Sequence, residues 1–137
     1  MAVKADIRAS RRSDLERENV KLVVLELFNG LGKPVLLYCF YHPDTALEPL
    51  IKLNSSLLET SESSCNIVIG EFNLPELDWS EDCCAPVITG SRTDHNVFCD
   101  QLMADNFFQQ FVLDPLTLRE SSLTYYSVTV LRSLRMY

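Results

Sequence analysis

The chain has 137 residues, which is enough for one small domain with a single hydrophobic core. Hydrophobic residues make up 47% and charged residues 23%, a balance typical of folded globular proteins and unlike that of disordered chains. The formal net charge of -7 argues against strong, unaided binding to a phosphate backbone, because that affinity comes from Lys and Arg. The sequence also lacks an apolar run of the ~20 residues that cross a bilayer, so we expect no membrane partner.

The first 19 residues are polar and mixed in charge. Arg8, Arg11 and Arg12 are interleaved with acidic residues, whereas transit peptides are poor in acids. No apolar secretory segment follows these basic residues. We therefore expect residues 1–19 to be disordered and to add no strand, and we expect a cytoplasmic or nuclear protein.

Two strands and a helix are predicted next along the chain. Residues 20–28 are rich in β-branched and apolar types, and the apolar run 35–41 is expected to pair back on them after a turn. Thr45 and Glu48 have the spacing of a capping box, and leucines follow at helical spacing until about Glu59. A hairpin followed by a helix is therefore expected here.

The second half of the chain repeats the alternation of strand and helix. We predict a strand over 66–70, a loop over 71–92, a helix from Thr93 or Asp94 to about Asn106, and a strand over 107–113. Residues 123–131 have strand-like composition, but the tail over 120–137 otherwise diverges. Strands that alternate with amphipathic helices predict an α/β domain, in which helices pack on a sheet.

The most informative segment is the exit of the predicted strand 66–70. Gly70 ends this strand, and Glu71 and Asn73 follow two residues apart, so on an extended chain both side chains point to one face. A carboxylate and an amide in this position are suited to holding water or phosphate oxygens. Ligands bind beyond the strand ends in sheets of this type, which makes Glu71 and Asn73 candidate site residues.

This segment also carries a family resemblance. The stretch Ile67-Val-Ile-Gly-Glu-Phe-Asn-Leu-Pro-Glu-Leu-Asp-Trp79 resembles the Gly-Asp-Phe-Asn motif of the endonuclease/exonuclease/phosphatase (DNase I-like) superfamily, in the form found in LINE-type retrotransposon endonucleases. Leu36 to Asp44 resembles the family's strand that ends in Tyr-Arg-Pro-Pro, and Asn106 to Arg119 resembles its segment after the second helix. Residues 20–119 are therefore identified as a partial domain of this family.

The resemblance implies a partial αββα sandwich and Mg²⁺-dependent hydrolysis of phosphodiesters, with DNA as the partner and no small-molecule cofactor. Tyr41 matches the family's active-site tyrosine, which hydrogen-bonds the phosphate region. Glu71 matches the motif aspartate, which orients or activates the attacking water. Asn73 matches the motif asparagine, which holds the catalytic geometry and a phosphate oxygen. The Mg²⁺ ion would polarise the phosphoryl oxygen.

Three departures from the family pattern indicate a domain that is inactive alone. Glu71 has one methylene more than the motif aspartate, which moves the carboxylate by roughly 1.5 Å, and a 1 Å misplacement can lower a rate about 10²-fold. The family's early strand with its metal-binding glutamate is not recognisable in residues 1–19, and no Ser-Asp-His segment occurs. We therefore expect a truncated endonuclease domain of retrotransposon origin. The alternatives are a phosphodiesterase completed by another chain, and a non-catalytic α/β interaction or nucleic-acid-binding module.

Simpler interpretations apply to several of these residues. Tyr41 is also compatible with a strand-end aromatic, and Asn73 with a turn residue. His42 is expected to point at solvent or at a substrate backbone. His95 follows Asp94 at a predicted helix start, which favours ordinary capping over a catalytic pair. The five cysteines include no Cys-x-x-Cys pair, which argues against a disulfide framework and a zinc site, and Cys39 and Cys65, in or beside apolar runs, are expected to be buried thiols.

Overall fold

Strands and short helices alternate along the chain in this computed structural model, which describes residues 7–28, 30, 32–43, 45–79, 86–110 and 128–133. No helix within these ranges is long and apolar enough to cross a membrane. In chain order the elements are β1 (Arg8–Arg11), β2 (Lys21–Phe28), β3 (Val35–Tyr41), α1 (Leu47–Thr60), β4 (Cys65–Glu71), β5 (Leu77–Trp79), β6 (Pro86–Ile88), α2 (Thr93–Val97), η1 (Phe98–Met103), α3 (Ala104–Asn106), β7 (Phe108–Gln110) and β8 (Val128–Ser133).

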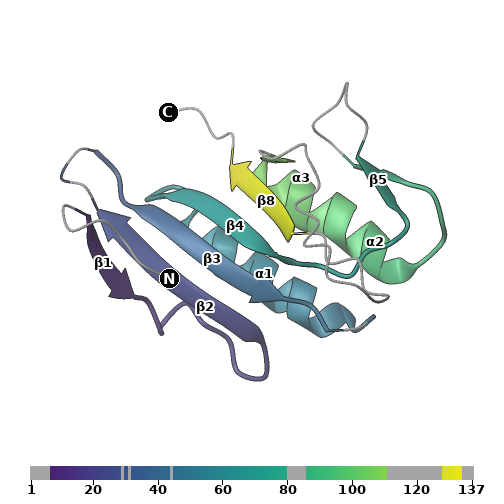
Figure 1. Cartoon of the computed structure of the whole chain (residues 1–137), viewed down its shortest axis with the longest axis horizontal. Coiled ribbons are helices and arrows are strands. Elements are labelled where there is room, and N and C mark those ends of the chain that lie inside the picture. The colour runs from purple at the N-terminus through teal and green to yellow at the C-terminus, as the bar shows by residue number, and fades with distance from the viewer. Residues whose placement is uncertain are drawn as a thin grey trace, which may run out of the picture.

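The centre of the molecule is a six-stranded sheet with the strand order β1-β2-β3-β4-β8-β7 (Figure 1). The pair β3 and β4 is parallel, and the other neighbouring strands are antiparallel. Helix α1 connects β3 to β4 and crosses behind the sheet in Figure 1, so the three elements form a β-α-β unit. Strands β5 and β6 form a separate hairpin. The predicted α/β class is therefore confirmed.

The hydrophobic core lies between one face of the central strands and the helices. Side chains alternate in direction along a strand, and every second residue of β2, β3 and β4 points to the helices. Each buried Leu, Val or Phe side chain stabilises the fold by about 1.5–3 kcal/mol. The main core residues are Leu22, Val24, Leu36, Tyr38, Phe40, Val68, Leu50, Leu53, Leu57, Phe98 and Leu102.

The predicted helices and the strands predicted over 20–28, 35–41 and 66–70 are found with small shifts at their ends, and two local predictions are wrong. Residues 111–113 of the predicted strand 107–113, and residues 123–127, lie outside the described residues. Helix α1 has Ala46 as its N-cap and receives no side-chain cap, so Thr45 and Glu48 do not form a capping box. The predicted loop 71–92 contains β5 and β6, which pair from Leu77↔Ile88 to Trp79↔Pro86. These are three-residue strands, and so short a run has no readable periodicity.

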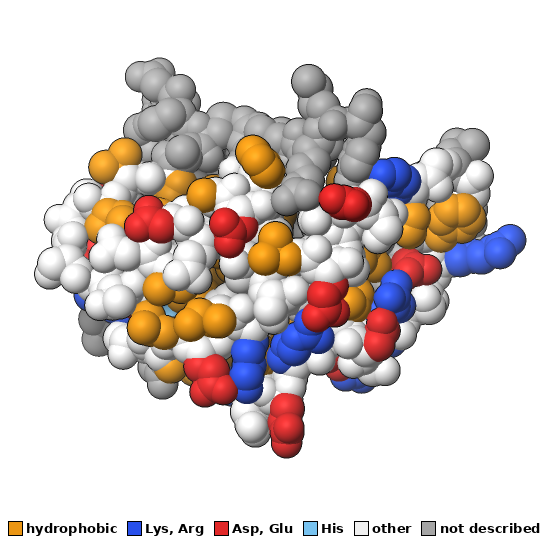
Figure 2. Space-filling model, turned by 180° about the vertical axis from the view of Figure 1, so that it is seen from behind, with side chains coloured by type: hydrophobic (Ala, Val, Ile, Leu, Met, Phe, Trp, Pro, Cys, Tyr) orange, Lys and Arg blue, Asp and Glu red, His pale blue; other side chains and the backbone are white. Residues whose placement is uncertain are grey.

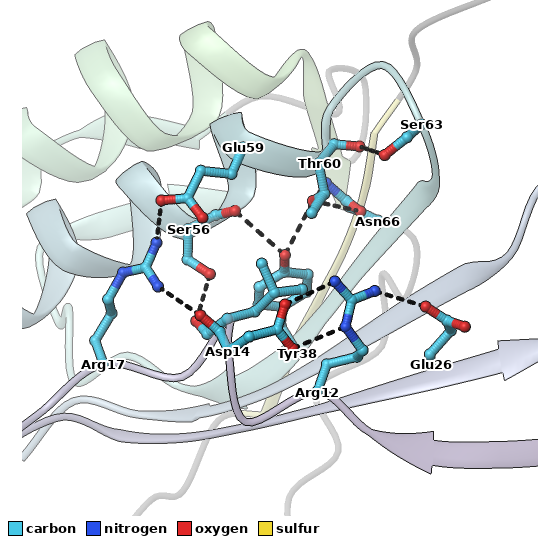
Figure 3. Close-up of polar contacts among 11 residues, drawn as sticks. Arg12, Asp14, Arg17, Glu26, Tyr38, Ser56, Glu59, Thr60, Ser63 and Asn66 are labelled. Carbon is cyan, nitrogen blue, oxygen red and sulfur yellow. Dashed lines mark hydrogen bonds and ion pairs between the residues drawn. The ribbon is translucent and has the colours of Figure 1, made fainter.

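The N-terminal segment also differs from expectation, because its described part is ordered. Strand β1 pairs with β2 at the edge of the sheet although its side chains are exposed. Leu15, which is only 3% exposed, enters the core and its carbonyl accepts a hydrogen bond of 2.6 Å from Ser56 Oγ. Arg12 forms ion pairs with Asp14 and Glu26, as Figure 3 shows. Residues 7–19 therefore belong to the domain.

Polar side chains are buried where β3 and β4 meet α1. Tyr38 Oη shares a hydrogen bond of 3.0 Å with Thr60 Oγ1 and donates to the carbonyl of Ser56 (Figure 3). Asn66 Nδ2 donates to Thr60 Oγ1 and to the carbonyl of Leu57. A buried polar group is stable only when it is hydrogen-bonded, so these contacts fix the position of α1 against the strands.

On the helix side, acidic and basic side chains lie beside one another (Figure 2). The pairs on this part of the surface include Lys52 with Glu48, at 2.7 Å, and Arg17 with Glu59, at 2.5 Å. Exposed pairs of this kind contribute at most about 1 kcal/mol each. Ile51 of α1 is 48% exposed on the same helix. This described face is therefore mixed in charge.

Gly70 allows β3 and β4 to approach each other closely near their C-terminal ends. It pairs with Phe40 in the parallel register, and a Cβ atom at position 70 would overlap the carbonyl oxygen of Phe40. This neighbour is backbone, so it has little freedom to move away. The absence of a side chain at Gly70 is therefore a requirement of this strand pair.

We expect Gly70→Ala to lower the free energy of unfolding by about 1–3 kcal/mol, because the strands must separate to admit the methyl group. Urea unfolding followed by circular dichroism measures this change. Gly90→Ala is the matched control, because its Cβ would meet the flexible end of the Glu76 side chain. Equal losses in the two variants would contradict a special requirement at Gly70.

Candidate functional site

The exits of β3 and β4 lie side by side at one edge of the sheet. Tyr41 is the last residue of β3 and Glu71 is the last residue of β4, and the two are partners in the parallel register. Parallel strands joined by a crossover helix place their C-terminal ends at the same edge. The structure therefore brings together two of the residues that the sequence singles out.

Asn73 joins this pair through a turn. Its φ of 49° lies in the left-handed region, so the chain is not extended here, contrary to our expectation. The Asn73 side chain nevertheless hydrogen-bonds Glu71, and Asn73 Nδ2 donates to the carbonyl of His42. Asn tolerates the left-handed region better than most residues. Tyr41, Glu71 and Asn73 thus form one cluster, which we call the exit cluster; their catalytic roles stay predictions.

Glu71 is partly buried, and its environment changes its acidity. Burial disfavours the ionised carboxylate and raises the pKa of Glu71, while the hydrogen bond with Asn73 acts in the opposite direction and only partly offsets it. The net result is a raised pKa. A carboxylate with a raised pKa is a stronger base, which suits a group that accepts a proton from water.

Lys21 lies beside the exit cluster, and sequence reasoning missed it. It is the first residue of β2 and pairs with Tyr41 in the antiparallel register. Lys21 Nζ is 4.9 Å from the centroid of the Tyr41 ring, a cation–π distance. The sequence could have indicated this position, because the predicted pairing of residues 20–28 with 35–41 places the start of the first run opposite the end of the second. Lys21, Tyr41 and Glu71 form one row across three strands.

The described residues do not fit a Mg²⁺ site that this chain holds alone. They contain no group of three or more His, Cys, Asp or Glu side chains able to enclose a metal ion. In the row of the exit cluster, Glu71 supplies one carboxylate and Lys21 adds a positive charge. Asn73 directs its amide nitrogen to the His42 carbonyl. Mg²⁺ binds through carboxylates, waters and substrate phosphates, so a second source of oxygen ligands is needed.

We expected His42 to point at solvent or at a substrate backbone, but its side chain is buried. Its side chain has 0% exposure, and its ring stacks on Phe40 with 6.2 Å between the centroids. The ring nitrogens contact the carbonyl oxygens of Phe72 and Ala46 at 2.8 and 2.7 Å. Sequence reasoning missed this role because a polar residue between a strand and Pro43 is typical of an exposed turn.

Asp94 and His95 are also buried, and both lie in α2. Asp94 is inside α2 and provides no cap, contrary to our expectation; it pairs with Arg92 at 2.6 Å and with His95 Nδ1 at 2.9 Å. His95 Nε2 accepts a hydrogen bond of 3.0 Å from the backbone N–H of Glu76. Both ring nitrogens are therefore in use. This Arg92–Asp94–His95 chain fastens the segment that follows Asn73 to helix α2.

Cys39, Cys65 and Cys99 are free thiols, and each is only partly buried, so the burial predicted for Cys39 and Cys65 is incomplete. Burial, reinforced by the negative charge of Asp100, raises the pKa of Cys99 to about 11. The thiol is therefore protonated at neutral pH and unreactive. Cys83 and Cys84 lie outside the described residues.

Comparisons of this chain with protein-family models, with curated proteins and with solved structures found no match.

The raised pKa of Glu71 predicts a pH-dependent effect of Glu71→Gln. The folded state binds the proton more tightly than the unfolded chain, so the ionised side chain destabilises the fold at pH values above the folded pKa. We expect Glu71→Gln to raise the free energy of unfolding at pH 8 by about 0.5 kcal/mol. This gain should shrink as the pH falls through the folded pKa.

Urea unfolding between pH 8 and pH 4 measures this gain in stability. Glu18→Gln, which changes an exposed carboxylate, is the charge-matched control. A loss of stability at pH 8 would contradict this prediction.

The effect of Asp94→Ala on the free energy of unfolding should depend on pH in the opposite sense to that of Glu71→Gln. Burial raises the pKa of Asp94, but the hydrogen bonds from Arg92 and His95 outweigh it and the pKa is lowered. The stabilisation is thus present above the unfolded pKa and is lost as the pH falls through the folded pKa. We expect Asp94→Ala to lower the free energy of unfolding at neutral pH by about 2 kcal/mol, measured by urea unfolding. Asp100→Ala, an exposed position in the same helical run, should be nearly neutral; similar losses in both variants would argue against the buried network.

Proposed function

We propose that this chain is part of a Mg²⁺-dependent endonuclease domain of retrotransposon origin, and that by itself it does not hydrolyse phosphodiesters. The observation that carries this proposal is the exit cluster. Tyr41 and Glu71 are register partners at one edge of the sheet, and the side chain of Asn73 lies close enough to the Glu71 carboxylate to offset part of the rise in its pKa. These are the residues that match the tyrosine, aspartate and asparagine of the family motifs.

Each residue of the exit cluster supports one part of phosphodiester chemistry. Glu71, whose pKa is raised, is suited to orient water and accept its proton. Tyr41 offers a hydroxyl and Asn73 an amide to phosphate oxygens. Lys21, beside the Tyr41 ring, adds positive charge at the edge where an anionic strand of DNA would approach. Bound Mg²⁺ would supply stabilisation of the charge on phosphoryl oxygens.

The proposed lack of activity follows from what the exit cluster lacks. Glu71 stands where the family has an aspartate, and the longer side chain shifts the reacting carboxylate. Within the described part of the chain, Glu71 belongs to no group of three or more His, Cys, Asp or Glu side chains that could hold a metal ion. Catalysis depends on reacting groups being placed to within a fraction of an ångström, so these two changes together remove most of the rate.

The second face of the sheet supports the proposed αββα sandwich. Opposite to the helices, β2, β3 and β4 align apolar side chains in register, with one row of Val23, Cys39 and Ile69. Val23 is 38% exposed. A second sheet packed on this face would bury such rows, as in other two-sheet folds. The same face favours a second candidate function, a non-catalytic α/β module that binds a partner there.

Plasmid nicking tests the proposal on activity. Purified chain is incubated with supercoiled plasmid and Mg²⁺, beside the Glu71→Ala variant. We expect no nicking by either protein above the background without protein. Mg²⁺-dependent nicking by the natural chain that disappears in Glu71→Ala would contradict the proposed inactivity.

Binding at the exit cluster is tested separately by amide chemical shifts in NMR spectra. Titration with a short DNA oligonucleotide and Mg²⁺ should shift the signals of Tyr41, Glu71 and Asn73, with Mg²⁺ alone as the control. A Lys21→Ala variant should reduce these shifts. If the oligonucleotide shifts none of these signals, the nuclease proposal fails and the interaction module is the better explanation. A reverse-transcriptase reading frame beside the coding sequence would support a retrotransposon origin.

A further inference from the structure

His42 connects the end of β3 with the exit of β4 and with the start of α1. It is the residue after β3, and its backbone N–H donates a hydrogen bond of 2.8 Å to the carbonyl of Glu71. Its own carbonyl accepts the hydrogen bond from Asn73 Nδ2. Its ring contacts the carbonyl of Phe72 through Nδ1 and that of Ala46 through Nε2. His42 thus reaches the exit of β4 and the start of α1 together.

A carbonyl oxygen only accepts hydrogen bonds, so at each contact the ring nitrogen donates when it carries a hydrogen. A neutral imidazole makes one such donation and a doubly protonated imidazole makes both. The ring has 0% exposure, so water cannot replace these partners. Its stacking on Phe40, with an interplanar angle of 14°, fixes the plane of the ring. An imidazole has nitrogens on opposite sides, which is the shape required to reach Phe72 and Ala46 at once.

We propose that His42 is a positioning residue, which holds Asn73 and Glu71 in the geometry of the exit cluster. What the cluster binds rests on the proposed function, but the positioning does not. The Nδ1 contact fixes the carbonyl of Phe72, the residue between Glu71 and Asn73. With that peptide fixed, the left-handed turn at Asn73 directs its side chain back to the His42 carbonyl and to Glu71.

Two amide substitutions separate the two ring contacts. In His42→Asn, the shorter amide places an N–H near the position of Nδ1, so it restores the donor to Phe72. In His42→Gln, the longer amide places an N–H near the position of Nε2, so it restores the donor to Ala46. His42→Phe keeps an aromatic ring on Phe40 but removes both ring nitrogens and so both contacts with the carbonyl oxygens. His95→Phe is the matched control, because His95 is also 0% exposed with both ring nitrogens bonded.

The readout is hydrogen exchange of the Asn73 side-chain amide, followed by NMR on the full chain, with urea unfolding measured in parallel. We expect exchange to be roughly fivefold faster in His42→Phe and in His42→Gln, because the hydrogen bond of Asn73 is weakened. His42→Asn should return the exchange rate to near its natural value. His95→Phe should lower stability without changing this rate.

The proposal would be overturned by an unchanged exchange rate in His42→Phe, by an equal change in His95→Phe, or by rescue in His42→Gln as good as in His42→Asn. If His42→Phe does not fold, the comparison of His42→Asn with His42→Gln decides. The oligonucleotide titration of the natural chain is a separate measurement. Its failure would remove the proposed function and leave the exchange result on His42 valid.

Discussion

The parallel pairing of β3 and β4 is the constraint on which the rest of the structure depends. It requires a crossover, which α1 provides, and it places the ends of both strands at one edge of the sheet. Gly70 permits the close approach of the two strands next to that edge. A residue with a side chain there would move Glu71 away from Tyr41. The absence of a side chain at Gly70 therefore permits both the close packing of β3 on β4 and the geometry of the exit cluster.

Buried polar residues help to hold the segments around this edge. His42 and His95 are both fully buried, and each bonds to backbone on a different side of the turn at Asn73. On the opposite end of α1, Tyr38 and Asn66 form the corresponding network. Burying such groups is unfavourable unless each has a partner, but a complete set of partners specifies one arrangement. His42 acts on the turn at Asn73 directly, through the carbonyl of Phe72, whereas His95 holds the later segment at Glu76.

The two faces of the sheet have different consequences for function. The helices cover one face and complete a core, so the central strands are stable as a unit. On the other face, rows of apolar residues run across β2, β3 and β4 and end in the polar row of Lys21, Tyr41 and Glu71. An apolar face bordered by a polar edge is the arrangement expected where a second layer packs beside a site. The proposed endonuclease domain and the alternative interaction module both use this face, and they differ in whether the edge binds phosphate.

The sequence by itself determined the α/β class, the positions of β2, β3, α1 and β4, and Glu71, Asn73 and Tyr41 as candidates. These follow from local signals, namely periodicity, turn residues and a short motif. Only the tertiary structure decided that polar β1 joins the sheet, that Lys21 lies over Tyr41, and that His42 is buried. Strand pairing joins residues far apart in the chain, and the fate of a polar side chain depends on the partners it finds. His42 has the sequence context of an exposed turn, and it is buried because the carbonyl oxygens of Phe72 and Ala46 converge on its ring.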